Sequence, residues 1–185
     1  LIHGVPMIGH CYFRTKICSS ISDAYVATCD KEIYDYIHSI GGKAIMTSDS
    51  HDRASDRTAE AMLKIESETG LKLDIVVMVQ GDEPMIIPEM ISEALSPFKD
   101  DSSVNVVNLM SKISTVEEFE DPNEVKVVVD NNSNAIYFSR EPIPSPIYGW
   151  KNFPRYMQTG IIAFRRNALL KFNSMDETPL EQIES

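Results

Sequence analysis

Short apolar runs alternate with amphipathic segments along the first part of the chain. Apolar runs at 24–28, 43–47, 74–80 and 104–110 have the length of buried strands. Between them, apolar residues at helical spacing predict helices over 6–17, over 31–39, from the end of a polar stretch (48–55) to about 69, and over 88–98. This alternation predicts βαβ units, and therefore a mostly parallel sheet flanked by helices on both faces.

The second half of the chain has a different pattern. A strand at 125–129, a polar turn at 130–134 and a return strand at 135–138 predict an antiparallel hairpin. Four prolines between 142 and 154 mark a long loop, and a strand at 160–164 and a helix at 167–172 follow. We therefore expect a single α/β domain over 1–185, with an antiparallel extension over 120–165 that serves the site and dimerisation.

Composition excludes several classes of function. The 185 residues carry 17 Lys and Arg against 28 Asp and Glu, a formal net charge of -11, so we expect no nucleic-acid partner. No apolar run is long enough to span a membrane, so no membrane partner is expected. The cysteines are three and form no CxxC pair, which argues against structural zinc and favours a cytoplasmic location.

The sharpest polar motif is Gln-Gly-Asp-Glu-Pro at 80–84, directly after the most apolar strand. In open parallel sheets, ligands bind beyond the carboxyl ends of the strands, and Gly81 would let a ligand approach the backbone closely. Asp82 would then offer a carboxylate to a hard cation such as Mg²⁺. The same residues also suit an ordinary turn into the next helix, and from the residues alone both interpretations stay open.

A second polar cluster follows the strand at 43–47. It holds His51, two arginines including Arg57, and several hydroxyls, beside the start of a helix. Such a loop suits a nucleotide, because guanidiniums bind oxygens and helix N-termini favour anions. The simpler interpretation is a helix capped by Ser55 or Asp56, with Arg57 as a surface charge, and these residues alone favour it.

A third cluster belongs to the hairpin. Lys126 lies within an apolar strand, and Arg140 follows the return strand. Together the two cations could bind a carboxylate or phosphate, for which Arg is the better bidentate partner. The alternative is an edge strand protected from aggregation by its lysine, and these two interpretations also stay open.

Taken in order, these blocks resemble the cytidylyltransferases that activate 3-deoxy-manno-octulosonate (Kdo), nearly from end to end. The matching blocks are Gly-Val-Pro-Met-Ile at 4–8, Asp-Ala-Tyr-Val-Ala-Thr-Cys-Asp at 23–30, the loop at 46–57, Val-Gln-Gly-Asp-Glu-Pro at 79–84, Asp-Pro-Asn-Glu-Val-Lys-Val-Val at 121–128, Tyr-Phe-Ser-Arg-Glu-Pro-Ile-Pro at 137–144 and Pro-Leu-Glu-Gln-Ile-Glu at 179–184. The resemblance implies a Rossmann-like nucleotidyltransferase fold. It also implies Mg²⁺-dependent transfer of CMP from CTP to a 3-deoxy-2-ulosonic acid, with release of pyrophosphate, by a cytoplasmic homodimer that serves bacterial lipopolysaccharide biosynthesis.

The resemblance also implies roles for individual residues. Asp82 would be the Mg²⁺ ligand, with Gln80 beside it facing the sugar, and both count as catalytic. Ser55 and Arg57 would contact the cytidine, with His51 supporting their loop. The residues expected to bind the sugar acid are Gln80, Asn123, Lys126, Arg140, Gln158 and Glu181.

The chain departs from the family pattern in three places. The family's triphosphate loop, of the type ARxxSxRLPGKPL, would precede Leu1, and a further Asp ligand would follow the last residue, so we expect missing material at both ends. Gln158 and Ile162 stand where the family has His and Tyr, and Ala54 where it has Gly. A different acceptor (8-amino-Kdo or an acylneuraminate-like acid) and a non-catalytic nucleotide-binding relative therefore remain alternatives.

The expected homodimer has weak support in the residues themselves. Trp150, Phe153 and Tyr156 follow the hairpin in the proline-rich stretch and would be exposed there. An exposed patch of this kind can serve pairing. The expectation otherwise follows from the resemblance.

Overall fold

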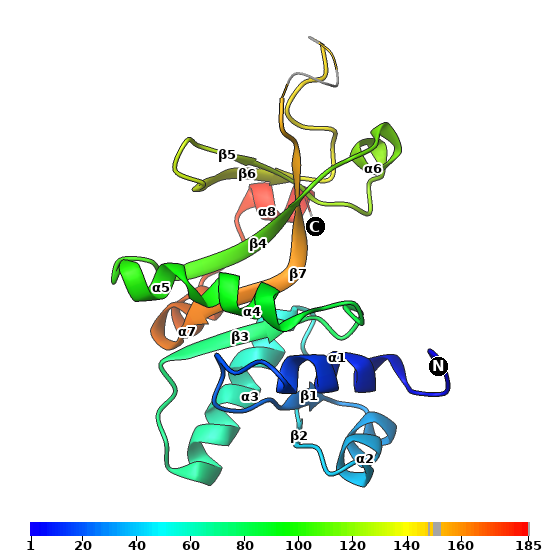
Figure 1. Cartoon of the computed structure of the whole chain (residues 1–185). Helices are drawn as coiled ribbons and strands as arrows, with labels where there is room; N and C mark the ends of the chain where they lie inside the picture. Colours follow the sequence, from blue (N-terminus) through cyan, green and yellow to red (C-terminus); the bar gives the residue numbers. More distant parts are fainter. Residues whose placement is uncertain (148, 150–152, 185) are drawn as a thin grey trace. The chain divides into compact units, whose positions relative to one another are not determined.

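The computed structural model describes residues 1–147, 149 and 153–184 (Figure 1). Within this part of the chain, helices alternate with strands through the first hundred residues, as the sequence predicts. The helices are α1 (Met7–Lys16), α2 (Lys31–Ser39), α3 (Ala54–Thr69), α4 (Pro88–Leu95), α5 (Pro97–Asp100), α6 (Val116–Glu120), α7 (Arg166–Asn173) and α8 (Pro179–Glu184), and the strands are β1 (Val26–Thr28), β2 (Ala44–Met46), β3 (Ile75–Val79), β4 (Val106–Lys112), β5 (Lys126–Val129), β6 (Ala135–Ser139) and β7 (Tyr156–Arg165).

The chain divides into two compact units. Unit 1 comprises Leu1–Val107 and Gly160–Met175, and unit 2 comprises Asn108–Thr159 and Asp176–Ser185. Unit 1 is discontinuous, because its second segment is separated from its first by most of unit 2. The predicted antiparallel extension, 120–165, overlaps unit 2 from 120 to 159.

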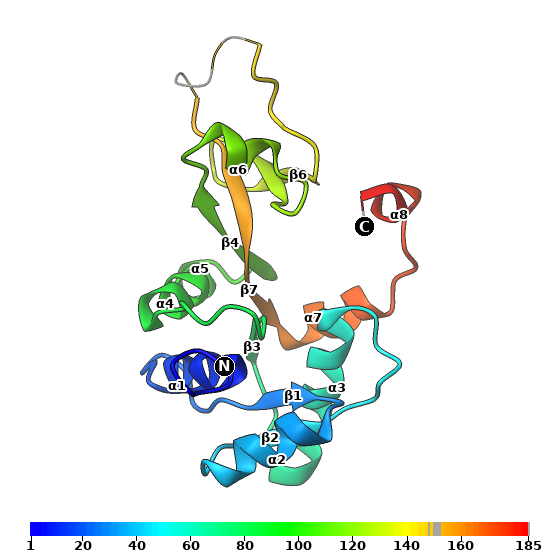
Figure 2. The ribbon, with the colours of Figure 1, turned by 90° about the vertical axis from the view of Figure 1, so that its right-hand side faces the viewer.

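In unit 1, β1 pairs in parallel with β2, as predicted, and α2 forms the crossover between them. Asp30 caps α2 as predicted, because its carboxylate accepts the backbone N–H of Glu32 at 2.7 Å. Figure 2 shows α1 and α4 on one side of β3, and α3 and α7 on the other. Two apolar clusters form much of the core: Tyr12, Ala24, Val26, Ile37 and Ala44 in one, and Ala59, Met62, Met78, Phe164 and Leu169 in the other.

The parallel part of the structure is smaller than the pattern predicts. In unit 1, β3 pairs with the second half of β7 in an antiparallel ladder, from Ile75 opposite Arg165 to Val79 opposite Ile161. The apolar run at 74–80 predicts a buried strand but carries no information on its direction. β7 enters this ladder directly from unit 2, and an antiparallel strand needs no helical crossover.

Proline and a capping motif explain two further differences in the helices. The helix predicted over 88–98 is divided into α4 and α5 at Pro97, which cannot donate a backbone hydrogen bond. The short helix α6 was not predicted. Thr115 and Glu118 form a reciprocal capping box at its start, so the Thr-x-x-Glu spacing was the signal available in the sequence.

In unit 2, the predicted hairpin is confirmed. β5 pairs with β6 in an antiparallel ladder, and Asp130 shapes the turn by accepting the backbone N–H groups of Asn132 and Asn134, each at 2.8 Å. β5 also pairs with the first half of β7, so it lies inside the sheet. Of the aromatic residues expected to form a pairing patch, Phe153 is exposed and Tyr156 half-buried, and Trp150 lies outside the described residues.

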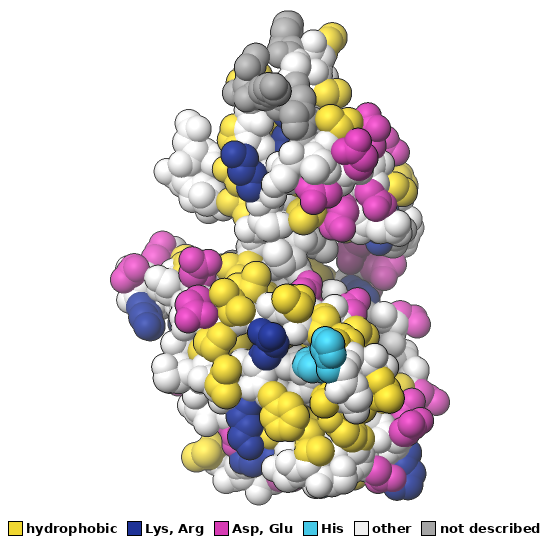
Figure 3. Space-filling model, turned by 45° about the vertical axis from the view of Figure 1, so that its right-hand side comes forward, with side chains coloured by type: hydrophobic (Ala, Val, Ile, Leu, Met, Phe, Trp, Pro, Cys, Tyr) yellow, Lys and Arg dark blue, Asp and Glu magenta, His cyan; other side chains and the backbone are white. Residues whose placement is uncertain are grey.

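The surface shown in Figure 3 includes a face of unit 1 on which hydrophobic side chains gather around a few basic and histidine side chains. Acidic side chains on this face lie mostly toward its margins, so the negative net charge is not concentrated there. Within the described ranges, no helix combines the length and the apolar character needed to cross a membrane.

Candidate functional site

The motif at 80–84 forms a tight loop at the carboxyl end of β3. The N–H of Gln80 donates to the carbonyl of Gly160 at 2.9 Å, and the N–H of Glu83 returns to the carbonyl of Gln80 at 3.2 Å. The thiol of Cys11, on α1, donates to the carbonyl of Gly81 at 3.2 Å. Burial raises the pKa of this thiol, which keeps it protonated and able to donate. The loop is therefore anchored by two other elements of unit 1, α1 and β7.

Asp82 is the exposed member of this loop. In the part of the chain that the structure describes, its carboxylate takes part in no hydrogen bond or ion pair. A Cβ at Gly81 would meet only Ile8, at an ordinary 3.4 Å, so the protein itself does not require glycine there. The close approach of a ligand to the backbone at Gly81 stays a prediction.

The single carboxylate of Asp82 suits a cation that takes most of its ligands from the substrate and from water. Among the described residues, no group of three or more His, Cys, Asp or Glu could hold a metal ion. A single carboxylate is nevertheless sufficient for Mg²⁺ when substrate phosphates and water supply its other oxygens. Asp82 suits this kind of site, and a preformed protein cage is absent from the described part of the structure.

The second predicted cluster is organised by a residue that the sequence analysis missed. Glu60 on α3 accepts the backbone N–H of Ser48 at 2.9 Å, hydrogen-bonds His51, and pairs with Lys64 at 2.7 Å. The Lys64 ammonium is the largest cause that lowers the pKa of Glu60 to about 2, followed by the Ser48 amide and His51. His51 and its loop are thus fixed to α3 by one ionised carboxylate.

Arg57 binds the start of the same loop. Its guanidinium donates to the hydroxyl of Thr47 at 2.6 Å and to the carbonyl of Ser48 at 3.0 Å. The structure places Arg57 in the first turns of α3, from where it binds the start of the loop that carries His51. The alternative of Arg57 as a plain surface charge is wrong, because its guanidinium is half-buried and bonded.

Ser55 lies in a different position from the one its capping interpretation required. α3 begins at Ala54 with Arg53 at the N-cap, and no side chain caps the helix, so neither Ser55 nor Asp56 is the N-cap. Ser55 is 8% exposed, and its carbonyl accepts the side-chain amide of Asn173 on α7 at 2.9 Å. Ser55 thus lies buried in the first turn of α3, where it is bonded to α7.

The third cluster forms within unit 2 around the turn at 121–124. Lys126 is completely buried, and its ammonium donates to the carbonyls of Asp121 at 2.8 Å and Glu124 at 2.7 Å. The guanidinium of Arg140 donates to the carbonyl of Pro122 at 3.0 Å, and Asn123 bonds the Asp121 carboxylate at 2.9 Å. The structure thus brings three predicted residues to one turn.

Burial lowers the pKa of Lys126, because the charged form is removed from water. The alternative of a lysine that guards an edge strand is wrong. Lys126 lies opposite Ser139 on one side and Met157 on the other, so β5 is an inner strand at this position.

Glu184, which the sequence analysis did not single out, joins α8 to the hairpin. Its carboxylate accepts the Ser139 hydroxyl at 2.8 and 2.9 Å, hydrogen-bonds the Tyr137 hydroxyl, and accepts the Arg140 N–H at 3.3 Å. Glu181 lies one helical turn earlier and is half-buried. The Glu-x-x-Glu spacing, which places both on one face, was the available signal.

Gln158, the predicted residue that departs from the family pattern, lies in the first half of β7. Its side-chain oxygen accepts the amide of Asn108 on β4 at 3.2 Å. The other side-chain atom of Asn108, Oδ1, is buried without a hydrogen-bond partner. Gln158 is therefore oriented by its neighbouring strand within unit 2.

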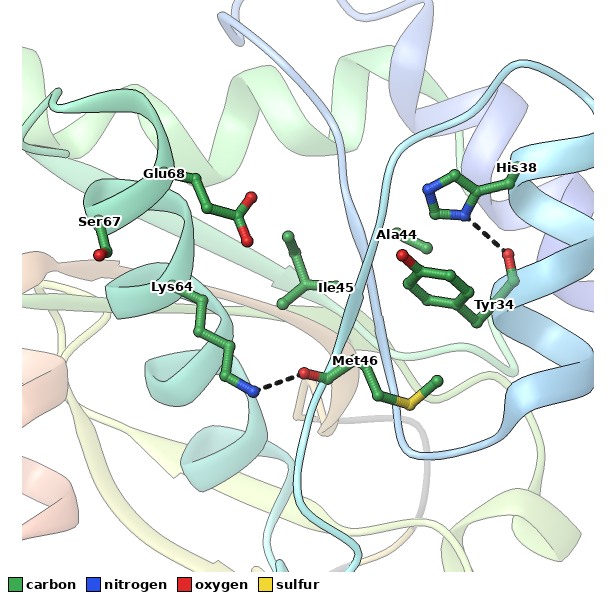
Figure 4. Close-up of a pocket in the computed structure, with 8 residues that line it drawn as sticks. All are labelled: Tyr34, His38, Ala44, Ile45, Met46, Lys64, Ser67 and Glu68. Atoms are coloured by element: carbon green, nitrogen blue, oxygen red, sulfur yellow. Dashed lines mark hydrogen bonds between the residues drawn. The ribbon is translucent and has the colours of Figure 1, made fainter.

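A cavity of about 430 Å³ lies elsewhere in unit 1 and contains none of the predicted site residues. Figure 4 shows it along β2, with Tyr34 and His38 of α2 on one side and residues of α3 on the other. The ammonium of Lys64 donates to the carbonyl of Met46 at 2.7 Å, drawn as a dashed line in the figure. The lining residues are Tyr34, His38, Ala44, Ile45, Met46, Lys64, Ser67 and Glu68.

The chain is similar to known proteins along its whole length. A family model described as cytidylyltransferase matches residues 1–185. The 3-deoxy-manno-octulosonate cytidylyltransferase of Trichlorobacter lovleyi is 41% identical over 191 residues, which cover 98% of this chain and 73% of that protein. The protein of the same name from Escherichia coli is 40% identical over 185 residues, covering 100% of this chain and 72% of the relative.

Solved structures agree with these matches. A CMP:2-keto-3-deoxy-manno-octonic acid synthetase complexed with CTP aligns with a TM-score of 0.87 at 38% identity, over 98% of this chain and 72% of that one. A 4-diphosphocytidyl-2C-methyl-D-erythritol synthase from Anaerococcus prevotii aligns with a TM-score of 0.56 at 14% identity, over 95% of this chain and 68% of that one, which shows the fold alone. The predicted α/β nucleotidyltransferase fold class is confirmed.

Proposed function

The chain belongs to the cytidylyltransferase family, and from this we propose that it transfers CMP from CTP to 3-deoxy-manno-octulosonate (Kdo), releasing pyrophosphate, for bacterial lipopolysaccharide biosynthesis. The observation that carries the proposal is the end-to-end match to relatives with this activity in their names, including a structure complexed with CTP. The exposed Asp82 carboxylate, at the carboxyl end of a strand, gives local support.

The reaction is a displacement at phosphorus. The anomeric hydroxyl of the sugar acid forms a bond to the α-phosphorus of CTP and loses its proton. The bond from that phosphorus to the bridging oxygen breaks, and pyrophosphate leaves. Such a transfer depends on positioning and charge neutralisation more than on covalent catalysis by the protein.

The residues of unit 1 have nucleotide-side roles in this proposal. Asp82 would hold Mg²⁺, which neutralises charge on the phosphates when bound. Gln80 precedes it on the same loop and would face the acceptor. Ser55 and Arg57 would contact the cytidine, with His51, bound by Glu60, supporting their loop.

The residues of unit 2 have acceptor-side roles. Arg140 is exposed and keeps donors for a carboxylate beyond its bond to Pro122. Lys126 is buried on two carbonyls, so we assign it to shaping the turn as well as to contributing positive charge. Asn123, Gln158 and Glu181 complete the proposed set of acceptor-binding residues.

The proposed setting is a cytoplasmic homodimer. The three cysteines are free, which suits a reducing compartment. The dimer rests on the family resemblance, and exposed Phe153 gives it modest support.

A different ulosonic acid is the second candidate acceptor. The observation that favours it is Gln158 together with Ile162, since an amide and an alkyl group stand where the family pattern has an imidazole and a phenol. Replacing two hydrogen-bonding groups changes which sugar hydroxyls can be satisfied in the site. The 8-amino relative of Kdo and acylneuraminate-like acids are the alternatives.

The test is pyrophosphate release by the protein with CTP and Mg²⁺ against Kdo and a panel of related acids. We expect release with Kdo, and a loss of at least about 100-fold in kcat for Asp82→Asn, because a metal ligand is removed. Glu89→Asn, an exposed change at the start of α4, is the matched control and should retain activity.

Each other outcome has a definite meaning. If pyrophosphate is released only with another acid, the proposed reaction is retained but that acid, and not Kdo, is the acceptor. Release that survives Asp82→Asn contradicts the metal assignment. If no acid supports release, CTP binding by calorimetry distinguishes a non-catalytic nucleotide-binding protein from one without a nucleotide site.

A further inference from the structure

The side chain of Glu83 makes a contact to which no role has yet been given. It leaves the loop that carries Asp82 and reaches β7, where its Oε1 accepts the backbone N–H of Gly160 at 3.0 Å. The N–H of Gln80, from the same loop, donates to the carbonyl of Gly160 at 2.9 Å. Both backbone polar groups of Gly160 are therefore bound by the loop.

The absence of a side chain at Gly160 is required by this contact. A Cβ there would lie 2.8 Å from Oε1 of Glu83, 2.9 Å from its Cγ and 3.0 Å from Cβ of Gln80. Gly160 itself is buried, and a side chain there would displace the Glu83 carboxylate from its position. The glycine creates the space that the carboxylate of Glu83 fills.

Adjacent carboxylates on the loop thus have opposite environments. Asp82 is exposed, and no hydrogen bond or ion pair to it occurs among the described residues, whereas Glu83 is half-buried and bonded to the sheet. The contacts of Gln80 and Glu83 with Gly160 restrict the backbone of the turn on both sides of Asp82, and with it the direction in which the Cα–Cβ bond of Asp82 leaves the chain.

We propose that Glu83 is a positioning residue, which ties the turn to the backbone of β7 and so holds the Asp82 carboxylate where it can bind the cation of the reaction. This inference rests on the proposed function, in which Asp82 holds Mg²⁺. The competing role for Glu83 is a second ligand or a source of negative charge. The two roles differ in what they require, because positioning needs an acceptor of the correct length and the competing role needs a charge.

Two conservative variants separate reach from charge. Glu83→Gln keeps the length and a carbonyl oxygen that can accept the Gly160 N–H, but it removes the charge. Glu83→Asp keeps the charge, but it is one methylene shorter and cannot reach Gly160 unless the turn moves. We expect Glu83→Gln to retain kcat within about threefold and Glu83→Asp to lose about 30-fold, since small misplacements of reacting groups have effects of this order.

A readout independent of turnover accompanies the kinetics. Mn²⁺ binding in the presence of CTP, followed by electron paramagnetic resonance, should be weakened about tenfold in Glu83→Asp and be nearly unchanged in Glu83→Gln. The amide resonance of Gly160 should shift in Glu83→Asp, because its hydrogen bond is lost. Thermal unfolding of both variants confirms that the fold is retained.

The opposite ranking, with Glu83→Asp active and Glu83→Gln impaired, overturns the proposal in favour of a charge role. Equal activity of both variants and the wild type also overturns it. If the wild type releases no pyrophosphate, the proposed function fails instead, and the Mn²⁺ and amide measurements still show whether Glu83 orders the loop.

Discussion

At the scale of single residues, two glutamate side chains hold loops that carry polar groups. Glu60 joins Ser48, His51 and Lys64, and Glu83 joins its loop to Gly160. At Glu60, the lowered pKa keeps the carboxylate charged, and a charged acceptor binds N–H donors more strongly than a neutral one.

The substitution Glu60→Gln tests the contacts of Glu60 with its loop. The amide can still accept the Ser48 N–H, but it loses the ion pair with Lys64 and the charged partner of His51. We expect KM for CTP to rise about tenfold with kcat within about twofold, because the loop is assigned to nucleotide binding and hydrogen bonds to charged groups have energies of this size.

The control for Glu60→Gln is Glu68→Gln, an exposed change on the same helix, which should leave both constants unaltered. Steady-state kinetics at varied CTP decides the matter. A fall in kcat with KM for CTP unchanged would contradict the role of this loop in nucleotide binding.

The sequence predicted which loops carry chemistry, but it did not predict how they are held. The loops were found because polar residues follow apolar strands. The loop-holding contacts of Glu60 and Glu83 were not predicted. Ser48 and His51 lie 12 and 9 residues from Glu60 on a folded loop, and Gly160 lies 77 residues from Glu83 on another strand. Such pairings depend on tertiary structure, to which local patterns are blind.

At the scale of elements, α3 and α7 are joined by a bidentate ion pair across 100 residues of sequence. Arg166 donates from Nε to Oε1 of Glu66 at 2.7 Å and from Nη2 to Oε2 at 2.8 Å. The same carboxylate accepts the Leu73 N–H at 2.9 Å, which ties in the segment leading to β3. Three elements of unit 1 therefore meet at one carboxylate.

Arg166→Lys tests this junction. Lysine keeps the charge but cannot form the two parallel hydrogen bonds, so we expect the melting temperature to fall by about 3 °C, a typical shift for a domain of this size. Lys171→Arg, an exposed change on α7, is the control and should have no effect. A melting temperature equal to the wild type would show that the bidentate geometry contributes nothing measurable.

Prediction of the elements succeeded where local signals decide the structure. The capped helix α2 and the hairpin of β5 and β6 follow from Asp30 and from the polar turn at 130–134. The direction of β7 relative to β3 was not predicted, because an apolar run carries no information about which strand it will pair with or how.

At the scale of the whole molecule, two carboxylates link stability to pH. The pKa values of Glu60 and Glu66 are both lowered to about 2, chiefly by hydrogen bonds from Lys64 and Arg166 respectively, against an ordinary value of 4.5. A lowered folded-state pKa stabilises the protein above the unfolded value, and this stabilisation is lost as the pH falls.

We therefore expect the melting temperature to fall as the pH is lowered from about 4.5 toward about 2, within the window set by these pKa values. The double variant Glu60→Gln/Glu66→Gln should melt lower than the wild type above this window and show a flatter pH dependence within it. Calorimetry across this range measures both. An equally steep dependence in the double variant would assign the acid sensitivity to other carboxylates.

The discontinuity of unit 1 affects how the protein folds during translation. β3 is made early, but its partner within unit 1, the segment from Gly160 of β7, is made only after all of 108–159. During synthesis, the apolar edge of β3 therefore stays unpaired, and the Glu83 carboxylate stays without its Gly160 partner, until β7 has been translated. Unit 1 therefore cannot fold completely until its second segment, Gly160–Met175, has been translated. The unpaired edge of β3 is the place where a chaperone would protect the nascent chain most.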